Sequence, residues 1–189
     1  MPQFVHLHVH SQYSILDGQA SIQRLVDKAM ADGQPGIAIT DHGDMFGIKE
    51  FYNYVKKVKG KLKDKAADCE KRLEELRGGE AGAAEIADCE KQLAELKRKL
   101  AFKPIIGCEV YVARRRLHDK EGKPDQSGYH LILLAKNLKG YHNLIKIVSK
   151  AWTEGFYMRP RTDRVEIEKY HEGLICCSAC LAGEVPRAI

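Results

Sequence analysis

Three histidines near the start of the chain alternate with apolar residues. His6, His8 and His10 are each separated by one apolar residue. Because successive side chains of a β-strand point to opposite faces, a strand over residues 4–10 would place the three imidazoles on one face and the apolar residues on the other. Neutral imidazole is a common metal ligand, and two imidazoles on one face can converge on one ion. The pattern therefore predicts a metal-binding strand; an edge strand that carries surface histidines is the alternative.

Further potential ligands lie in or beside later apolar segments. They are Asp41, His42, Glu109, His130 and Cys180. In a parallel α/β barrel, side chains at one set of strand ends converge on a common site. Mixtures of histidine and carboxylate suit zinc, manganese or iron, and a carboxylate can bridge two ions because it has two oxygens. Paired ions activate water and stabilise the attacking and leaving oxygens of phosphoester hydrolysis. The whole set predicts that chemistry, whereas each residue alone would be an ordinary polar residue.

The segments between these residues alternate between extended and helical patterns. Ser21 is a good N-cap for a helix with apolar residues at helical spacing, and Gly33 would end that helix. Later segments repeat the two patterns: we expect strands over 36–40, 105–112, 130–135 and 174–178, and helices over 48–58, 141–151 and 165–170. Strands that alternate with helices predict an α/β fold, with a parallel sheet and helices packed outside it.

The region 60–101 interrupts this pattern. Residues 67–76 recur with small changes as residues 87–96, and a glycine-rich segment separates the copies. Each copy carries apolar residues at helical spacing, which predicts two amphipathic helices folded into an antiparallel hairpin inserted in the α/β body. Charges of both signs favour a solvated hairpin over a nucleic-acid-binding arm. Cys69 and Cys89 are expected to be small apolar residues of the seam; a metal or redox pair is the alternative.

Composition places the chain among globular proteins. With 189 residues, 44% of them hydrophobic and 30% charged, the chain can form one domain with a sizeable core. No apolar run reaches the length of a membrane span, and the start lacks the features of a signal peptide, so we expect a cytoplasmic protein without a membrane partner. The six cysteines form no extracellular framework and are expected to be reduced.

The net charge of +5 is a weak indication of a nucleic-acid partner. Two clusters of arginines add to it, and their side chains could contact DNA phosphates: Arg114, Arg115, Arg116, Arg159, Arg161 and Arg164. Solvated loops are the alternative for both clusters.

Several motifs resemble the PHP (polymerase and histidinol phosphatase) domain, in the form found at the N-terminus of the bacterial replicative DNA polymerase III alpha subunit. The segments that carry the resemblance are 6–14, 39–43, 106–109 and 130–135, with further similarity at 16–18, 140–144, 149–151 and 180–184. The resemblance covers residues 1–189 apart from the hairpin at 60–101. It implies a PHP domain that forms the N-terminal part of a larger polymerase subunit.

The fold implied by the resemblance is a distorted seven-stranded β/α barrel, similar to a TIM barrel, that holds up to three divalent ions. Zinc, manganese, iron or magnesium are the implied metals. By motif, His8, His10 and Glu109 would share one ion. Glu109 would bridge to a second ion, which His130 and Cys180 would also bind.

The resemblance implies a third ion bound by Asp17 and His42. Asp41 matches the family's Thr-Asp-His segment, either as a ligand or as a residue that orients ligands. His6 precedes the paired ligand histidines and is expected to support them rather than to bind an ion.

The sequence departs from the family pattern in two places. The family's last metal motif, an Asp-x-His after a later strand, does not follow Gly183. We therefore expect a truncated barrel with about five of the seven strands, in which two ion sites lack a ligand. The polymerase palm with its catalytic carboxylates is also absent, so this chain is not expected to polymerise DNA by itself.

The resemblance implies that the parent protein is a DNA-directed DNA polymerase, a nucleotidyltransferase of DNA replication. Its implied partners are DNA, the rest of the polymerase chain, a proofreading exonuclease subunit and other replisome subunits. Within this chain, the expected activity is that of a metal-dependent phosphoesterase, such as a 3′–5′ exonuclease that proofreads. Two alternatives remain: a structural metal-binding module that docks the polymerase core or a proofreading subunit, and a free-standing PHP phosphatase that acts on a small phosphomonoester.

Overall fold

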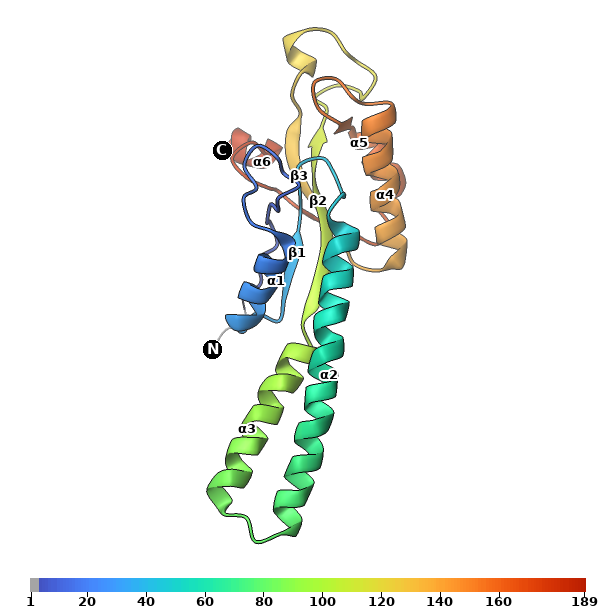
Figure 1. Cartoon of the computed structure of the whole chain (residues 1–189). Coiled ribbons are helices and arrows are strands. Elements are labelled where there is room, and N and C mark those ends of the chain that lie inside the picture. Colours follow the sequence, from blue (N-terminus) through green and yellow to red (C-terminus); the bar gives the residue numbers. More distant parts are fainter. Residues whose placement is uncertain (1–3) are drawn as a thin grey trace.

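The computed structural model describes residues 4–189. Its elements follow in the order α1 (Ile22–Ala31), β1 (Gly36–Ile39), α2 (Ile48–Gly78), α3 (Ala83–Leu100), β2 (Lys103–Val112), the 3-10 helix η1 (Lys123–Asp125), β3 (Tyr129–Ala135), α4 (Leu138–Thr153), β4 (Arg161–Thr162), α5 (Arg164–Tyr170), β5 (Leu174–Cys177) and α6 (Glu184–Ala188). The strands form one sheet, and a helical hairpin made of α2 and α3 projects away from it (Figure 1).

The sheet is mixed rather than parallel. Its strand order is β1-β2-β3-β5, with β4 paired to the end of β2. β1 and β4 run parallel to β2, whereas β3 is antiparallel to β2 and β5 is antiparallel to β3. The expectation of a wholly parallel sheet is therefore wrong at β3 and β5. The link from β2 to β3 contains only the short helix η1, whereas a parallel crossover usually runs through an α-helix packed on the sheet. The described residues supply five strands and do not by themselves form a seven-stranded barrel.

The histidine-rich N-terminal segment runs beside β1 but is not a regular strand. Ala38 N donates to His6 O over 2.9 Å, and Thr40 N donates to Val9 O over 2.8 Å. Three residues of this segment, from His6 to Val9, therefore lie beside two residues of the neighbouring segment, from Ala38 to Thr40. The extra residue interrupts the expected alternation of side chains between the two faces. As a result Leu7 is 42% exposed, whereas Val9 packs against the core.

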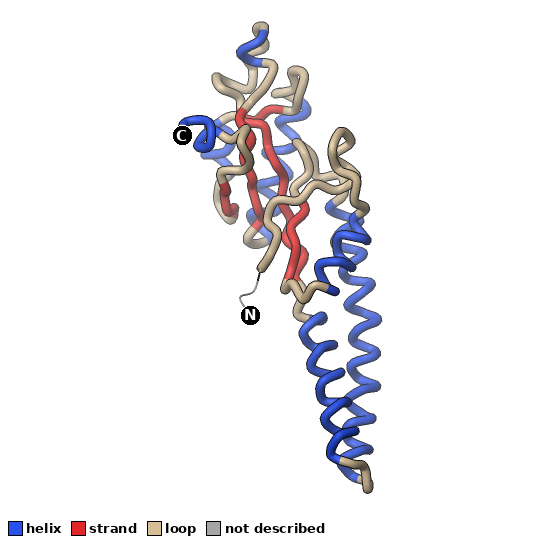
Figure 2. The backbone as a smooth tube through the Cα atoms, turned by 90° about the vertical axis from the view of Figure 1, so that its left-hand side faces the viewer, coloured by secondary structure: helices blue, strands red, loops and turns tan. Residues whose placement is uncertain are grey.

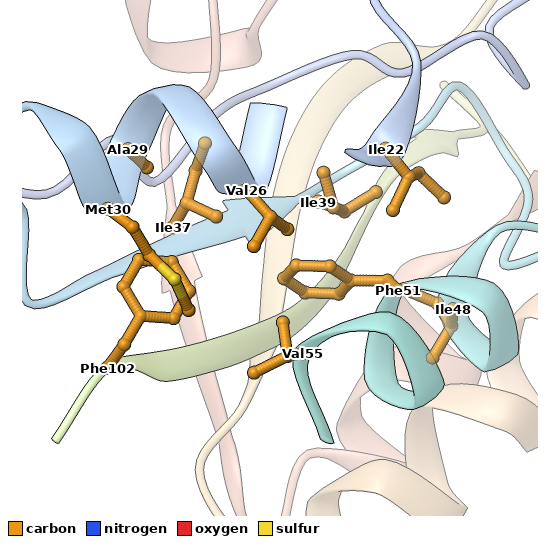
Figure 3. Close-up of a cluster of buried hydrophobic side chains, with 10 residues drawn as sticks. All are labelled: Ile22, Val26, Ala29, Met30, Ile37, Ile39, Ile48, Phe51, Val55 and Phe102. Atoms are coloured by element: carbon orange, nitrogen blue, oxygen red, sulfur yellow. The ribbon is translucent and has the colours of Figure 1, made fainter. Parts of the chain in front are cut away.

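Helices α1, α2 and α4 cover one face of the sheet. Ile37 of β1 packs with Val26 of α1 and Phe51 of α2 in the cluster that Figure 3 shows. In the adjoining cluster, Cys108 of β2 packs with Leu144 of α4. Because strand side chains alternate, the odd-numbered positions of β2 point away from these helices.

The opposite face, which we call the inner face, carries a smaller apolar cluster and the polar side chains of the sheet. Ala38 and Ile132 belong to its apolar cluster. Glu109 of β2 lies across from Ile132 of β3, and Tyr111 lies across from His130 in the same register. The pairing therefore brings predicted metal ligands from two strands to one face.

Helix α2 merges two predicted helices. The expected helix 48–58 and the first arm of the hairpin form one helix of 31 residues. Gly60 lies inside it, but an exposed glycine within a helix costs only about 1 kcal/mol, so the helix continues through it. Helix α3 returns toward the sheet (Figure 2), and the seam between the two helices contains Ala66, Leu73, Cys89 and Leu93. None of the described helices is long and apolar enough to cross a membrane.

Leu73→Ala is expected to destabilise the hairpin and leave the sheet intact. Leu73 is 7% exposed in the seam, and truncation of a buried leucine costs about 2–5 kcal/mol. Amide hydrogen exchange should become faster in α3 and in the outer part of α2, while exchange in β2 and β3 stays unchanged. Leu138→Ala is the matched control, because it removes a side chain that is 69% exposed. Faster exchange throughout the sheet would contradict a seam that is separate from the core.

Candidate metal centre

Glu109 is a buried carboxylate near the end of β2, on the inner face of the sheet. Its side chain has no exposed surface. Two hydrogen bonds fix its backbone: Glu109 N donates to Asp41 O over 3.0 Å, and Gly43 N donates to Glu109 O over 2.8 Å. A buried carboxylate is costly unless cations or hydrogen-bond donors surround it, so its neighbours decide what this site can do.

Four imidazoles surround the Glu109 carboxylate. Its Oε2 atom lies 3.4 Å from His8 Nε2, 3.2 Å from His10 Nε2 and 2.7 Å from His42 Nδ1. Its Oε1 atom lies 2.6 Å from His130 Nδ1. The histidines come from the N-terminal segment, the turn after β1, and β3, so three segments far apart in the sequence meet at one side chain.

A thiol and a second carboxylate lie at the edge of this cluster. Cys180 Sγ is 3.8 Å from Glu109 Oε1 and 3.5 Å from His130 Nδ1. Asp17 Oδ2 is 2.9 Å from His42 Nε2. The structure thus brings together the seven residues to which the resemblance assigned an ion.

Two groups of these residues are compact enough to hold an ion each. The first consists of His8, His10 and Glu109, and the second consists of His42, Glu109 and His130, with ligand atoms that all lie within 4.8 Å of one another in each group. The first group is the one that the sequence predicted. The second differs from the prediction because His42 joins it, while Cys180 lies beside it. Glu109 belongs to both groups, as expected for a bridging carboxylate.

The atoms of the cluster are arranged to receive a cation. Glu109 Oε2 and His42 Nδ1 are buried and 2.7 Å apart, yet neither makes an aligned hydrogen bond. His8 Nε2 and His10 Nε2 face each other at 3.1 Å, where each can instead present a lone pair to an ion. Imidazole nitrogens, carboxylate oxygens and a thiol are ligands of zinc, manganese and iron. The residues present therefore fit divalent ions.

The electrostatics of the cluster also favour a cation. Burial alone would raise the pKa of Glu109, but contacts with His10, His130 and His42 outweigh burial and hold that pKa well below its usual range. The contact with Glu109 is the main reason why the pKa of His42 is raised to about 9, and Asp17 adds to it. His42 in turn lowers the pKa of Asp17. Both carboxylates are therefore ionised at neutral pH and can neutralise bound ions.

Asp41 fixes the turn over residues 11–14, which directly follows His8 and His10. Its Oδ1 atom accepts from Ser11 N at 2.6 Å and from Ser14 Oγ at 2.8 Å, and its Oδ2 atom accepts from Ser11 Oγ at 2.7 Å. Ser14 Oγ also lies 3.2 Å from His10 Nδ1 and accepts from His42 N at 3.2 Å. This geometry favours the orienting role for Asp41, since its oxygens are occupied by hydrogen bonds.

His6 lies outside the cluster. Its side chain is exposed, and its ring packs edge-on against Phe4 with 4.6 Å between ring centroids. Among the contacts of the described residues, none joins the His6 ring to a predicted ligand, so the supporting role expected for it is filled by Asp41, Ser11 and Ser14. Sequence reasoning missed the two serines, although both lie within the motif that begins at the histidines.

Two further residues that the sequence did not reveal shape the site. The Tyr111 ring stacks on His42 at 6.1 Å between centroids and meets His130 edge-on at 5.0 Å. Its place two positions after the central carboxylate was the available signal, because such positions share a face of a strand. Gly43 has a φ of 66°, and a Cβ there would come within 2.6 Å of Pro160 Cγ. The turn after His42 therefore requires glycine.

The predicted arginine clusters do not form one basic patch. Arg161 is buried and donates to the carbonyl oxygens of three loop residues, so its prediction as a DNA contact is wrong. Arg115 and Arg116 pair with acidic side chains, and Arg114 lies over a tyrosine ring. Arg159 lies beside the candidate metal centre, where its Nη1 atom donates to the Tyr111 hydroxyl over 2.7 Å.

Comparison with known proteins identifies the family to which this cluster belongs. The sequence pattern of the PHP domain matches residues 6–189, which include every residue of the cluster. The chain belongs to the PHP domain family. The histidines around Glu109 are therefore residues of a PHP domain.

The relatives of this PHP domain are much longer proteins. DNA polymerase III subunit alpha of Borreliella burgdorferi is 40% identical over 188 residues, which cover 99% of this chain and 13% of the relative. The same subunit of Treponema pallidum is 41% identical over 184 residues (97% and 12%), and that of Thermus aquaticus is 37% identical over 191 residues (99% and 12%). The chain is homologous to the N-terminal region of these subunits and spans only 12–13% of their length.

Glu109→Gln is expected to empty the metal centre. The substitution keeps the shape of the side chain but removes the negative charge that both ligand groups share. Loss of a residue that only hydrogen-bonds to a metal ligand lowers metal affinity about 10–100-fold, so loss of the bridging carboxylate should lower the affinity at least as much. Elemental analysis after dialysis measures the divalent metal per chain. Glu172→Gln is the control, since its side chain is 74% exposed. A wild-type metal content in Glu109→Gln would contradict the bridging role.

Proposed function

We propose that this chain, residues 1–189 with the hairpin at 60–101 inserted, is the N-terminal PHP domain of a bacterial replicative DNA polymerase alpha subunit. We further propose that its metal centre hydrolyses phosphodiester bonds at the 3′ end of DNA. The observation that carries the proposal is the convergence of four imidazoles on both oxygens of the buried Glu109. The relatives named above support the identity of the parent protein.

Up to three divalent ions would be bound by this cluster. The residues that would hold them are His8, His10, Asp17, His42, Glu109, His130 and Cys180. Glu109 would bridge two of the ions because its two oxygens face different imidazoles. Ions at these positions supply an activated water and stabilise the attacking and leaving oxygens of a phosphodiester. Imidazole and thiol ligands favour zinc or iron over magnesium, and the carboxylates also suit manganese.

A cleft of about 670 Å³ beside the cluster suits an unpaired end of DNA. His42 and Tyr111 form part of its wall next to the metal centre. Its rim carries exposed apolar side chains: Ile15, Leu16, Phe46, Trp152, Phe156 and Met158. Aromatic faces stack on unpaired bases of any sequence, which is what an exonuclease requires of its binding site.

The aromatic side chains of the rim form a short stack. The Trp152 and Phe156 rings are 5.6 Å apart at an angle of 24°, and Phe46 lies 5.7 Å from Trp152. Trp152 is held in place because its Nε1 atom donates to Gly43 O over 2.8 Å. Arg159 also lines the cleft and offers a positive charge for a phosphate. Bases and backbone of a single strand would therefore both find partners near the ligands.

Deoxynucleotide incorporation would lie in parts of the parent protein outside this chain. The partners of that parent would be DNA, the rest of the polymerase chain, and a proofreading exonuclease subunit or other replisome subunits, in the cytoplasm. In the intact subunit we expect the distorted seven-stranded barrel of the family. The inner face supports this expectation, because Glu109 and His130 point away from the helices, as side chains inside a barrel do.

A nuclease assay tests the proposal directly. This chain and the intact polymerase subunit that contains it are each incubated with a 5′-labelled single-stranded oligonucleotide and manganese or zinc. We expect shortening from the 3′ end, and His10→Ala should reduce its rate about 100-fold or more. His142→Ala is the matched control, because that histidine is exposed on α4.

Three results would contradict this assignment. No shortening by either protein in manganese or zinc would reject the nuclease. Equal shortening by wild type and His10→Ala would trace the activity to another site. Hydrolysis of a small phosphomonoester without any shortening of DNA would favour the free-standing phosphatase instead.

A structural metal site is the second candidate, because Glu109 joins several segments. Ions held there would cross-link the N-terminal segment, the turn after β1, and strands β2 and β3. A chelator should therefore lower the melting temperature by about 5–10 °C, and zinc or manganese should restore it. Differential scanning calorimetry measures the shift, and Glu109→Gln should melt at the same temperature with or without chelator. A chelator shift without any hydrolysis would favour this candidate, whereas no shift in the wild type would reject it.

A further inference from the structure

We propose that Cys69 and Cys89 form an oxidation site that staples the helical hairpin with a reversible disulfide when a peroxide is present. The two Sγ atoms face each other across the seam, 3.6 Å apart. Cys69 belongs to α2 and Cys89 belongs to α3. The inference rests on these two helices alone and is independent of the function proposed for the metal centre.

The hairpin already holds both thiols in position. Each thiol donates to the backbone carbonyl oxygen of the other cysteine, over 3.6 Å in both directions. Both side chains therefore point across the seam rather than along it. A disulfide requires a sulfur–sulfur distance of about 2.05 Å. The remaining approach is small for two side chains that are already in van der Waals contact.

The repeat in the sequence accounts for this placement. Residues 67–76 and 87–96 share one pattern, so each helix carries a cysteine at the equivalent position of its apolar stripe. Because the two helices are antiparallel, only one pair of equivalent positions can lie directly opposite each other, and the contact between the sulfurs shows that it is the cysteine pair. Among the described residues, Cys69 and Cys89 form the one pair of thiols in contact.

The two thiols differ in access to an oxidant. Cys89 is 4% exposed, whereas Cys69 is only partly buried. Burial and the facing Cys89 thiol raise the pKa of Cys69, so a small deprotonated fraction of this thiol would attack hydrogen peroxide. In that step a sulfur–oxygen bond forms, the oxygen–oxygen bond breaks, and hydroxide leaves as water after it takes up the thiol proton. Cys89 would then attack the sulfenic acid: the sulfur–sulfur bond forms, the sulfur–oxygen bond breaks, and a second water leaves. Two electrons pass from the sulfurs to one peroxide.

The other cysteines provide the internal comparison. Cys108 is fully buried in the core, and Cys180 belongs to the metal centre. Cys176 is exposed on β5, and Cys177, the next residue of that strand, is partly buried. Limited peroxide should therefore cross-link the hairpin pair, whose sulfurs are in contact, in preference to Cys176 and Cys177, which are consecutive in β5 and point to opposite faces of the sheet.

Peptide mapping tests the staple. The protein is treated with one equivalent of hydrogen peroxide, alkylated and digested with trypsin. We expect residues 66–71 and 78–91 to appear as one linked pair, with a mass loss of about 2 Da relative to the two thiol peptides, and to separate after reduction. Cys69→Ser and Cys89→Ser should each abolish the pair, whereas Cys176→Ser, the matched control, should leave it unchanged.

Hydrogen exchange supplies a readout of what the bond does. The oxidised wild type should exchange more slowly than the reduced protein in the outer part of α2 and in α3, and the double variant Cys69→Ser/Cys89→Ser should show no difference. The proposal is overturned if peroxide leaves both cysteines as thiols, or if Cys69 goes on to sulfinic acid without a cross-link. It is also overturned if either cysteine pairs with Cys176 or Cys180 in preference to its neighbour.

Discussion

The arrangement of the sheet depends on one buried charge. Glu109 has no exposed surface, and a carboxylate in that position without partners would destabilise the fold by several kcal/mol. Imidazoles surround both of its oxygens only when the N-terminal segment, the turn after β1, and β3 are all in place. The site is thus built by long-range contacts, and no single segment contains it.

The period of two along the strands separates this polar site from the apolar core. On β2, Cys108 points to the helices, whereas Glu109 and Tyr111 point to the inner face. Gly107, two positions before Glu109 on β2, has no space for a side chain, because a Cβ there would come within 2.6 Å of a Leu134 methyl carbon. The sheet can therefore pack closely beside the carboxylate, while the helices supply the apolar burial that stabilises it.

The residue types predicted which side chains gather around Glu109 better than they predicted the sheet. Histidines and carboxylates at strand ends reveal their chemistry by their identity and order, and all of them except His6 contact the cluster. The direction of β3 was missed, because apolar alternation has the same period in parallel and antiparallel strands. The signal for it was the segment 113–129, in which no helix is expected, whereas a parallel crossover usually runs through one. The burial of Arg161 could not be predicted, because its hydrogen-bond partners are backbone carbonyls of loops that only the folded chain brings together.

Helix α2 contributes to two apolar clusters that share no residue. Its first turns place Phe51 in the core with Ile39 of β1, close to the chain segment that carries His42. Its outer turns place Leu73 in a seam that shares no residue with that core. Outer turns can therefore open while Phe51 stays packed, because local unfolding follows the boundaries of apolar clusters. We therefore expect the hairpin to loosen or stiffen while the side chains around Glu109 keep their positions.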